Sequence, residues 1–344
     1  MKTIFIGPFG NGKVPTNGAS IKNYHILKRL KEEIQDLQAI DTDNWKRRPV
    51  MLLKMLWTIS RNPNARYILS LNSGSANKLI KIIYQLVPNA EVIYWVIGGS
   101  FGKWIEQGRL KAKDYEHLRL IIVEGATMKS QLKSVGLSNV EVIPNFKEIV
   151  SVAHTERNGD IIRFVFLSRI IPLKGCDLIF EAARQLNSEG FEKSFEIDFY
   201  GPIDSDYEAL FKQKIASIDN VKYCGFLDLR DTNNYSALGQ YDAMLFPTFW
   251  PGEGCPGIVI DAYMSGLPIL ASDWNMNKDY VQNGENGILF QAQNQQALTD
   301  VMRNAISGKY NLADMRKHAF ESIKRYDIKN VLSRENLAKL KIID

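Results

Sequence analysis

The sequence has few cysteines and histidines and no long apolar run. Its 344 residues include three cysteines, Cys176, Cys224 and Cys255, without the spacing of a disulfide framework or a metal site. The four histidines are also scattered. Apolar runs such as 92–97 are far shorter than the roughly 20 residues that cross a bilayer. These scarcities argue against a disulfide-stapled secreted domain, a metal centre and a transmembrane protein.

Two further absences concern location and order. The chain passes directly from Met1 into a strand-like run, without the apolar core of a signal peptide. Together with the unpatterned cysteines, this predicts a cytoplasmic protein. Hydrophobic residues make up 45% and charged residues 24% of the chain, as in ordinary folded proteins. At 344 residues the chain is long for one core, so we expect two domains.

Positive charge is concentrated in the first half. Residues 1–150 contain 22 lysines and arginines against 12 acidic residues, and the rest of the chain contains 21 against 26. The first half therefore has a net charge of +10 and the second of −5. Such an asymmetry suits an anionic partner, which could be a membrane, a polyanion or a phosphorylated acceptor.

Short β-rich runs alternate with helical patterns throughout, which is typical of βαβ units around parallel sheets. The polar stretch 151–160 interrupts this pattern and marks the predicted domain boundary. The helical pattern at 175–186 opens the second half after its first strand. The predicted strands are 3–6, 67–71, 91–97, 118–123 and 140–143, then 162–167, 195–200, 221–224, 243–246, 268–271 and 287–290.

The most informative segment is 249–268, where a loop broken by glycine and proline leads into a helical pattern. It contains two acidic residues eight positions apart, Glu253 and Asp261. Between them, backbone N–H groups stand where a helix begins, and a helix N-terminus favours anions such as phosphate. Carboxylates accept hydrogen bonds from hydroxyl groups. The segment therefore indicates a ligand with both phosphate and hydroxyls, such as a nucleotide sugar.

Two cations, Arg169 and Lys174, follow the first predicted strand of the second half. Fixed positive groups stabilise the negative charge that a leaving nucleoside diphosphate acquires. Taken singly, each residue can also be interpreted as a solvated cation on a loop.

Together the two segments resemble the signature of the retaining family-4 glycosyltransferases of the GT-B fold. The matching residues read Arg-x4-Lys-Gly over 169–175 and Glu-Gly-x-Pro, an acidic residue, then Ala-x-x-x-Gly-x-Pro over 253–268. The chain departs from the family at Asp261, where glutamate is usual. The resemblance implies an α/β fold with two Rossmann-like domains that face each other across a cleft. Residues 1–150 would bind the acceptor, 151–326 the nucleotide sugar, and 327–344 would form a helix that crosses back onto the first domain.

The resemblance also implies residue roles. Arg169, Lys174 and Glu253 are the expected catalytic residues, with the two cations steadying the leaving diphosphate, and Asp261 is expected to contact ribose. At Tyr200-Gly201 and Phe226-Leu227, ordinary packing at strand ends remains an alternative to contact with the base. The expected donor-binding residues besides Asp261 are Gly18, Tyr200, Gly201, Phe226, Leu227, Gly254, Cys255, Pro256, Gly257 and Ile258.

A glycine-rich loop follows the first strand, and Gly7 to Lys13 matches the first part of a phosphate-binding P-loop. The match then fails, because Val14 lacks the hydroxyl that magnesium requires. We expect instead a loop that leads to a helix near Gly18, where a donor phosphate can approach the backbone. A simple turn is the alternative.

We expect neither a metal nor another cofactor. Two Asp-x-Asp triplets, at 41–43 and 204–206, could indicate the metal site of a different glycosyltransferase fold. The second triplet precedes a predicted helix at 207–216, where Asp and Ser serve as caps.

Residues 45–61 form an apolar helical pattern with two tryptophans and flanking basic residues. One interpretation is an interfacial helix on anionic lipid at the inner membrane face. The other is a buried helix of the first domain.

Many family-4 enzymes have a histidine after a strand in the middle of the first domain, where it faces the donor sugar. The comparable segment here, 94–103, has none. The candidates for the acceptor or sugar face are Gly98, Gly99, Ser100 and Lys103.

The resemblance thus implies a metal-independent hexosyl or related transferase. It would move a sugar, with retention, from a nucleotide-diphosphate sugar to a glycan or lipid-linked acceptor in bacterial surface polysaccharide synthesis. No nucleic-acid partner is expected. Two alternatives stay open: a non-hydrolysing sugar-nucleotide epimerase and a catalytically silent nucleotide-sugar-binding protein.

Overall fold

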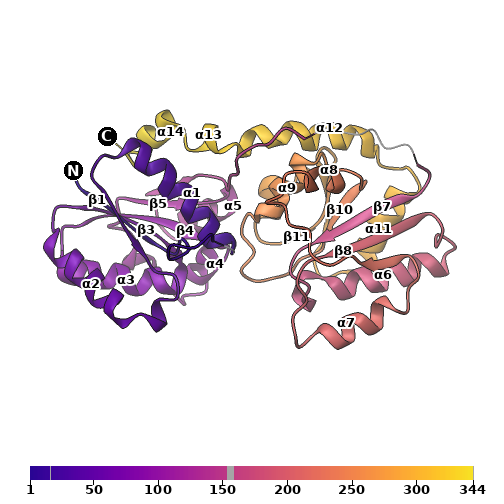
Figure 1. Cartoon of the computed structure of the whole chain (residues 1–344), viewed down its shortest axis with the longest axis horizontal. Helices are drawn as coiled ribbons and strands as arrows, with labels where there is room; N and C mark the ends of the chain where they lie inside the picture. Colours follow the sequence, from indigo (N-terminus) through magenta and orange to yellow (C-terminus); the bar gives the residue numbers. More distant parts are fainter. Residues whose placement is uncertain (16, 153–158, 344) are drawn as a thin grey trace. The chain divides into compact units, whose positions relative to one another are not determined.

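The computed structural model describes residues 1–15, 17–152 and 159–343. Its contacts divide the chain into two compact units (Figure 1). Unit 1 comprises Met1–Phe146 with Ile328–Asp344, and unit 2 comprises Lys147–Asp327. The division after Phe146 lies four residues before the boundary predicted from the sequence. Most of the polar stretch that marked this boundary, 153–158, lies outside the described residues.

Unit 1 is built on a sheet of six parallel strands in the order β2-β1-β3-β4-β5-β6. Its central strands are nearly continuous apolar runs, as expected for a parallel sheet covered on both faces. The strands are β1 (Thr3–Gly7), β2 (Leu37–Asp41), β3 (Arg66–Asn72), β4 (Glu91–Ile97), β5 (Leu120–Val123) and β6 (Val140–Val142).

The edge strand β2 is absent from the predicted strands. All five of its residues are only half buried, because the strand has one neighbour and lies at the margin of the sheet. Its sequence therefore lacks the apolar run that marks the central strands. The other predicted strands agree with the structure to within two residues at each end.

Helices flank the sheet of unit 1, with α2 and α3 on one side and α1 and α14 on the other (Figure 1). The C-terminal segment packs into the core of this unit, since Leu332, Leu337 and Ile342 are buried against Phe5 and Trp95. The helices are α1 (Gly18–Glu33), α2 (Pro49–Arg61), α3 (Ser73–Leu86), α4 (Phe101–Glu106), α5 (Ala126–Ser134), α13 (Ile328–Val331) and α14 (Arg334–Lys339).

Unit 2 has a second parallel sheet in the order β12-β11-β10-β7-β8-β9. A cluster of buried aromatic side chains, including Phe164, Phe180 and Phe199, fills one side of it. The strands are β7 (Ile162–Leu167), β8 (Phe195–Tyr200), β9 (Val221–Tyr223), β10 (Ala243–Phe246), β11 (Ile269–Asp273) and β12 (Gly287–Gln291).

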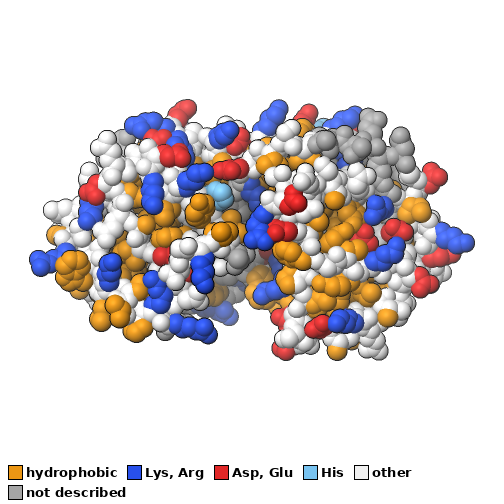
Figure 2. Space-filling model, in the orientation of Figure 1, with side chains coloured by type: hydrophobic (Ala, Val, Ile, Leu, Met, Phe, Trp, Pro, Cys, Tyr) orange, Lys and Arg blue, Asp and Glu red, His pale blue; other side chains and the backbone are white. Residues whose placement is uncertain are grey.

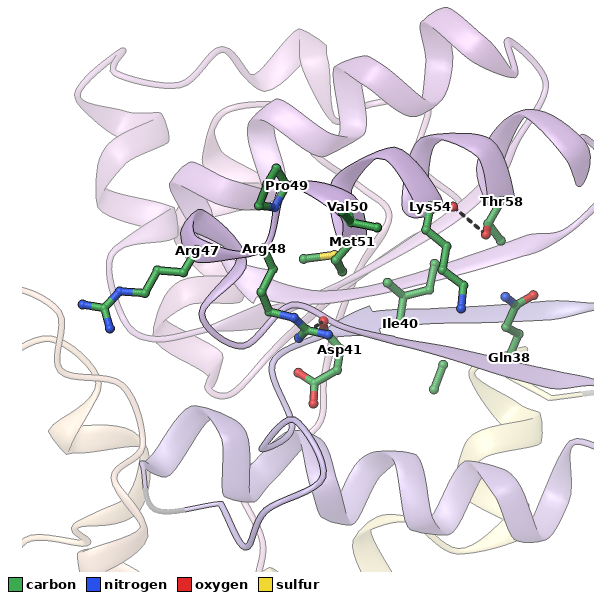
Figure 3. A pocket seen from close by; sticks show the side chains of 11 residues that line it. Gln38, Ile40, Asp41, Arg47, Arg48, Pro49, Val50, Met51, Lys54 and Thr58 are labelled. Carbon is green, nitrogen blue, oxygen red and sulfur yellow. Dashed lines mark hydrogen bonds between the residues drawn. The ribbon is translucent and has the colours of Figure 1, made fainter.

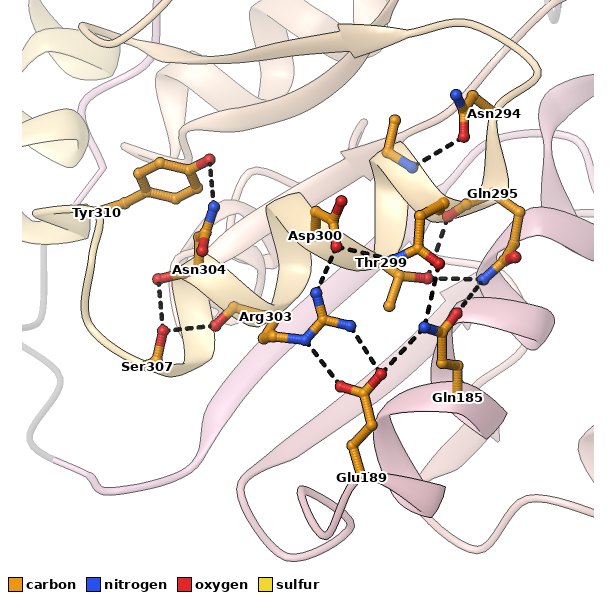
Figure 4. Close-up of polar contacts among 12 residues, drawn as sticks. Gln185, Glu189, Asn294, Gln295, Thr299, Asp300, Arg303, Asn304, Ser307 and Tyr310 are labelled. Carbon is orange, nitrogen blue, oxygen red and sulfur yellow. Dashed lines mark hydrogen bonds and ion pairs between the residues drawn. The ribbon is translucent and has the colours of Figure 1, made fainter.

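Helices α6 and α11 pack together on unit 2 and are joined by polar contacts at their exposed side (Figure 4). The Arg303 guanidinium on α11 binds both carboxylate oxygens of Glu189 at 2.8 Å. The helices are α6 (Cys176–Ser188), α7 (Glu208–Ile215), α8 (Asn234–Leu238), α9 (Gly257–Met264), α10 (Asn277–Tyr280), α11 (Gln295–Ile306) and α12 (Leu312–Ser322).

Each sheet reverses its strand order once. In unit 1 the chain places β2 on one side of β1 and β3 on the other, and in unit 2 it places β8 and β10 on opposite sides of β7. Ligands of open α/β sheets bind in the crevice at such a switch point, beyond the carboxyl ends of the strands. The fold thus predicts a ligand site beside β1 in unit 1 and beside β7 in unit 2.

Candidate functional site

In unit 2 the switch point brings together the two motifs found in the sequence. Arg169 and Lys174 follow β7, whereas Glu253 follows β10, and these two strands are neighbours in the sheet. Because parallel strands end at the same edge, residues almost 80 positions apart in sequence meet there.

The centre of this site is a buried ion pair. Lys174 Nζ lies 2.5 Å from Glu253 Oε2, and the two side chains are only 11% and 6% exposed. The hydroxyl of Thr248, which also follows β10, donates a hydrogen bond of 2.6 Å to the same carboxylate oxygen. A buried charge is costly unless it is paired and hydrogen-bonded, and here both conditions are met. The pair therefore holds a cation and an acceptor side by side at the switch point.

Two glycines allow the backbone segments of this edge to come close. Gly175 has a φ of +82°, and a Cβ there would lie 2.3 Å from the carbonyl oxygen of Pro247. Gly201 has a φ of +139°, and a Cβ there would lie 1.9 Å from the carbonyl oxygen of Ser168. Any side chain would collide with backbone at these two places. Only glycine permits the close packing around Lys174 and the end of β8.

The Arg169 side chain is more exposed to solvent than that of Lys174. It is exposed, and its guanidinium carbon lies 5.3 Å from the centre of the Trp250 ring. A guanidinium over an aromatic face is held by the ring quadrupole while its N–H groups remain available to a ligand. The cation is thus positioned by Trp250, on the same loop that carries Glu253.

Side chains of the segment after β11 hold the loop between Trp250 and Gly254 by hydrogen bonds. The Trp274 indole N–H donates to the Trp250 carbonyl at 2.8 Å, and the Asn275 amide donates to the carbonyls of Pro251 and Glu253. Tyr280 Oη lies 3.1 Å from the Gly254 carbonyl oxygen and 2.6 Å from Asn277 Oδ1, and burial raises the pKa of this tyrosine well above its ordinary value. Its hydroxyl therefore stays protonated, and its one proton is shared between these two acceptors.

Asp261 lies on α9 with its carboxylate fully engaged. Lys147 Nζ is 2.5 Å from both Oδ1 and Oδ2, and Tyr235 Oη donates to Oδ1 at 2.6 Å. The Asp261 side chain is 5% exposed. Burial, together with the Asp261 charge, holds the pKa of Tyr235 well above its ordinary value, so it remains a donor. The ribose contact expected for Asp261 stays a prediction, and it would compete with Lys147.

The aromatic residues predicted to border the base differ in exposure. Tyr200 is half buried at the end of β8 and its hydroxyl lies 3.1 Å from that of Tyr241. Phe226 is 67% exposed, and it follows Gly225, which has a positive φ. An exposed aromatic ring at the end of a sheet is available for stacking, and neighbouring Leu227 is half buried. The remaining predicted donor residues, Gly254, Cys255, Pro256, Gly257 and Ile258, form the lead into α9 and its first turn.

At the switch point of unit 1, the glycine-rich loop after β1 is held by the aspartates at the end of β2. Asp41 accepts backbone N–H bonds from Phe9 and Asn11, and Asp43 accepts one from Gly10. Helix α1 begins at Gly18, where nothing lies within 4 Å of an added Cβ. The first Asp-x-Asp triplet therefore shapes this loop.

The second triplet corrects a sequence interpretation. Asp204 Oδ1 accepts the backbone N–H of Asp206, so the triplet forms a turn. Helix α7 begins after Tyr207 without a side-chain cap, so the predicted capping role is wrong. Among residues 1–15, 17–152 and 159–343, no cluster of three or more Asp, Glu, His or Cys side chains could hold a metal.

The acceptor-face candidates Gly98, Gly99, Ser100 and Lys103 follow β4, where Gly98 has a φ of +87° and α4 begins at Phe101. Near the same edge of the sheet, Lys22 on α1 forms a 2.5 Å ion pair with Glu124, which follows β5, and both side chains are buried. This pair was not predicted, because its members are 102 positions apart in sequence.

A pocket of about 540 Å³ lies beside β2 in unit 1 (Figure 3). Arg47, Arg48 and Lys54 supply positive charge to its lining, which also contains Val50 and Met51 from α2. Helix α2 buries only Met55, Thr58 and Ile59. It exposes Val50 by 76%, Leu53 by 67% and Trp57 by 62%. The alternative of a buried core helix is therefore wrong, because the apolar row Val50–Leu53–Trp57 faces outward. Within the part of the chain that is described, none of the helices has the length and apolar content to cross a bilayer.

Comparison with known proteins agrees with this geometry. Residues 162–307 match the family model described as glycosyl transferases group 1. Residues 162–307 are thus similar to the group 1 glycosyl transferases. The matched range begins at β7 and ends just after α11, so it contains the whole sheet of unit 2 and the Lys174–Glu253 pair.

Two curated proteins are also similar to this chain. An amylovoran biosynthesis glycosyltransferase of Erwinia amylovora, AmsK, is 27% identical over 155 residues, which cover 43% of this chain and 37% of that protein. A phosphatidyl-myo-inositol mannosyltransferase of Mycobacterium leprae is 24% identical over 231 residues, which cover 64% of this chain and 58% of that protein. The chain thus spans between about a third and three fifths of the lengths of these relatives.

A solved structure matches almost the whole chain. The crystal structure of Anabaena HepE in complex with UDP superposes with a TM-score of 0.72 at 17% identity, covering 98% of this chain and all of that one. At this identity the likeness concerns the fold. The chain therefore has a GT-B fold, in which each of the two units contains a six-stranded parallel sheet.

Several residues of the site were missed in the sequence. Thr248 and Trp250 lie in the segment that leads to Glu253, and their position directly after a predicted strand is a signal that could have found them. Lys147 and Tyr235 are 114 and 26 positions from Asp261, with no motif of their own. Only the fold reveals that they meet.

Proposed function

We propose that this protein transfers a sugar from a nucleotide-diphosphate sugar to an acceptor. The Lys174–Glu253 pair at the switch point of unit 2 carries this proposal, because it places a buried cation beside a buried carboxylate where an α/β sheet binds its ligand. The relatives named for amylovoran biosynthesis and for mannosyl transfer support the same reaction class. The solved relative with bound UDP supports a nucleoside diphosphate as the leaving group.

The proposed roles follow from charge. Lys174 and Arg169 face the diphosphate and stabilise the charge that develops on it as the glycosidic bond breaks. Glu253 accepts hydrogen bonds from sugar hydroxyls, and Thr248 orients its carboxylate. The backbone from Gly254 to Ile258 leads into α9 and donates to phosphate. In the absence of donor, Lys174 and Glu253 neutralise each other.

We propose that the reaction retains the anomeric configuration and needs no metal, as the family-4 resemblance implies. The acceptor's hydroxyl oxygen forms the new bond to the anomeric carbon, the bond to the diphosphate oxygen breaks, and the donor phosphate accepts the acceptor proton. The predicted donor contacts of Gly18, Tyr200, Gly201, Phe226 and Leu227 belong to this proposal.

We further propose that the acceptor is a glycan or is linked to lipid, and that unit 1 contacts an anionic membrane surface. Hydrophobic side chains lie at the surface over α2 with lysines and arginines beside them (Figure 2). The row Val50–Leu53–Trp57 is suited to insertion among lipid headgroups, and Arg47 and Lys54 border it at the pocket beside β2. Cations beside an apolar face favour anionic lipid.

Product analysis tests the proposal. The purified chain would be incubated with UDP- and GDP-linked sugars, with and without a lipid extract or glycan acceptor, and nucleoside diphosphate release would be measured. We expect release that depends on acceptor, and a new glycosidic bond whose anomeric configuration equals that of the donor. NMR of the product gives the configuration. A chelator should leave the rate unchanged.

The other outcomes identify the alternatives. An epimerised sugar nucleotide, formed without acceptor, would overturn sugar transfer in favour of an epimerase. Donor binding without turnover under all acceptors would favour a silent binding protein. Inversion of the anomeric configuration would overturn retention alone.

A further inference from the structure

Lys147 contacts α9 although it belongs to none of the motifs found in the sequence. Its backbone N–H donates to the Tyr326 carbonyl at 3.0 Å, and Lys147 forms a parallel bridge with Asp327. These contacts fix the point from which the side chain starts. From there it reaches α9 and ends on the Asp261 carboxylate.

In this cluster the ammonium is the outer member and the carboxylate the inner one. The Lys147 side chain is 30% exposed, whereas Asp261 is 5% exposed and holds bonds from both Lys147 and the buried Tyr235 hydroxyl. A ligand that approaches Asp261 therefore meets the ammonium first. For the carboxylate to bind ribose instead, Lys147 would have to leave and give up a largely buried ion pair.

The ammonium also lies beside the start of α9. A Cβ on Gly257, the first residue of the helix, would be 3.0 Å from Lys147 Cε and 3.5 Å from Nζ. Pro256 provides no side-chain hydrogen bond to the first turn, and that turn has no acidic residue. Two positive features, the ammonium and the helix end, thus stand side by side, and Asp261 is the carboxylate bonded to the ammonium. An anion bound between them would be attracted by both.

We propose that Lys147 binds a phosphate group of the donor, and that Asp261 and Tyr235 position its ammonium. The proposal rests on the proposed function, because it requires a nucleoside diphosphate at the start of α9. It gives Asp261 a different task from the ribose contact implied by the resemblance. The shorter aspartate, in place of the usual glutamate, pairs with a cation that itself contacts the ligand.

Calorimetric titration with UDP and with uridine tests this role, because the two probes differ only in the diphosphate. GDP and guanosine serve as the second pair of probes. We expect Lys147→Met to weaken UDP binding roughly tenfold or more, the effect of losing one charge-assisted hydrogen bond, and to change uridine binding by less than about twofold. Lys147→Arg keeps the charge and should retain most of the preference for UDP.

Further variants distinguish the positioning of the Lys147 ammonium from an effect on folding. Asp261→Asn keeps the size of the side chain but removes the charge that holds the ammonium, so it should also lower the ratio of UDP to uridine affinity. Lys222→Met is the control, since Lys222 is 58% exposed and pairs only with Glu196 among the described salt bridges. A neutral double variant, Lys147→Met with Asp261→Asn, avoids a lone buried carboxylate and provides a folded protein if the single variant fails to fold.

The outcomes are distinct. Unchanged UDP affinity in the folded Lys147 variants would overturn the phosphate role. Tighter binding of both UDP and uridine in Lys147→Met would also overturn it, because Lys147 would then be an obstacle in front of Asp261. If the wild-type chain binds no nucleoside diphosphate, the proposed function itself fails, and the inference with it.

Discussion

The two units share an architecture and differ in what lies at the switch point. Each is a six-stranded parallel sheet whose strand order reverses once. In unit 2 the Lys174–Glu253 pair lies at the switch point and the Lys147–Asp261 pair lies at α9, and the hydroxyls of Thr248 and Tyr235 donate to the two carboxylates. In unit 1 a glycine-rich loop follows β1, and near the same edge of the sheet the buried Lys22–Glu124 pair joins α1 to the end of β5.

The two units therefore present two kinds of surface, charged pairs in unit 2 and an exposed apolar row with nearby cations in unit 1. Unit 2 contains two ion pairs whose carboxylates are buried and hydrogen-bonded, and the family model matches there. Unit 1 has an exposed apolar row on α2 and a cationic pocket, which are features of a contact surface. These features support the proposal that unit 2 binds the donor and unit 1 the acceptor.

The largest expected effect comes from breaking the Lys174–Glu253 pair. Lys174→Met leaves Glu253 buried and unpaired, so the free energy of unfolding should fall by about 3 to 5 kcal/mol. Glu253→Gln should act in the same direction. The double variant should recover most of the stability but not the activity, which should stay roughly 100-fold or more below wild type. Urea denaturation and nucleoside diphosphate release measure the two quantities.

A matched control exists on α7. Lys212 and Glu208 form a 2.6 Å pair, but their side chains are 65% and 47% exposed. The double variant Lys212→Met with Glu208→Gln should change stability by less than about 1 kcal/mol and leave activity intact. Equal effects of the two double variants would remove the distinction between the site and an ordinary surface pair.

The second effect concerns the surface of unit 1. Arg47→Ser with Lys54→Ser should weaken binding to phosphatidylglycerol-rich vesicles, at roughly fivefold for each cation, because each contributes about 1 kcal/mol near an anionic surface. Nucleotide binding should be unchanged. Vesicle sedimentation at low salt measures the affinity, with pure phosphatidylcholine as the neutral reference.

The control for this surface is Lys78→Ser with Lys81→Ser, which removes two exposed cations from α3 of the same unit. Its vesicle affinity should remain close to that of wild type. Equal losses in both double variants would indicate a general effect of net charge, and absence of wild-type binding would eliminate the membrane contact.

The third effect is on stability, and it distinguishes glycines that pack against backbone from a glycine with open space beside it. Gly175→Ala and Gly201→Ala place a Cβ against backbone carbonyls in unit 2, so each should cost at least about 2 kcal/mol of stability. Gly18→Ala in unit 1 meets open space and should change stability by less than about 1 kcal/mol. Thermal unfolding compares the three. A large loss of stability in Gly18→Ala would contradict the structure around α1.

The smallest effect is a loss of stability at alkaline pH. Burial raises the pKa of Tyr235, Tyr263 and Tyr280 in unit 2 and of Tyr94 and Tyr115 in unit 1. The folded state therefore keeps protons that the unfolded chain loses near pH 10. The free energy of unfolding should keep its full value below about pH 10. It should fall as the pH rises toward the pKa values that these tyrosines have in the folded state. Urea midpoints measured at rising pH test this, and a constant midpoint to about pH 11 would contradict it.

Much of the fold could be predicted from local patterns. The central strands β3, β4, β7 and β10 are apolar runs between helical patterns, and the structure confirms them. The edge strand β2 was missed, because partial burial removes the apolar run that marks a strand.

The residues of the site could be predicted where they lie close together in the sequence. Arg169 with Lys174, and Glu253 with Asp261, stood out by spacing, and the structure pairs Lys174 with Glu253. Long-range partners could not be found, since nothing near Lys147 or Tyr235 signals that Asp261 is their neighbour. Pairing of this kind is set by the sheet order and not by local sequence.

The most direct measurement is calorimetric titration of the full chain with UDP and GDP, in wild type and in the Lys174→Met, Glu253→Gln double variant. The expected result is saturable binding of at least one nucleoside diphosphate to wild type, lost in this variant and retained in the Lys212→Met, Glu208→Gln control. Binding that is absent in wild type, or equally strong in the Lys174, Glu253 double variant, would contradict a donor site at the switch point of unit 2.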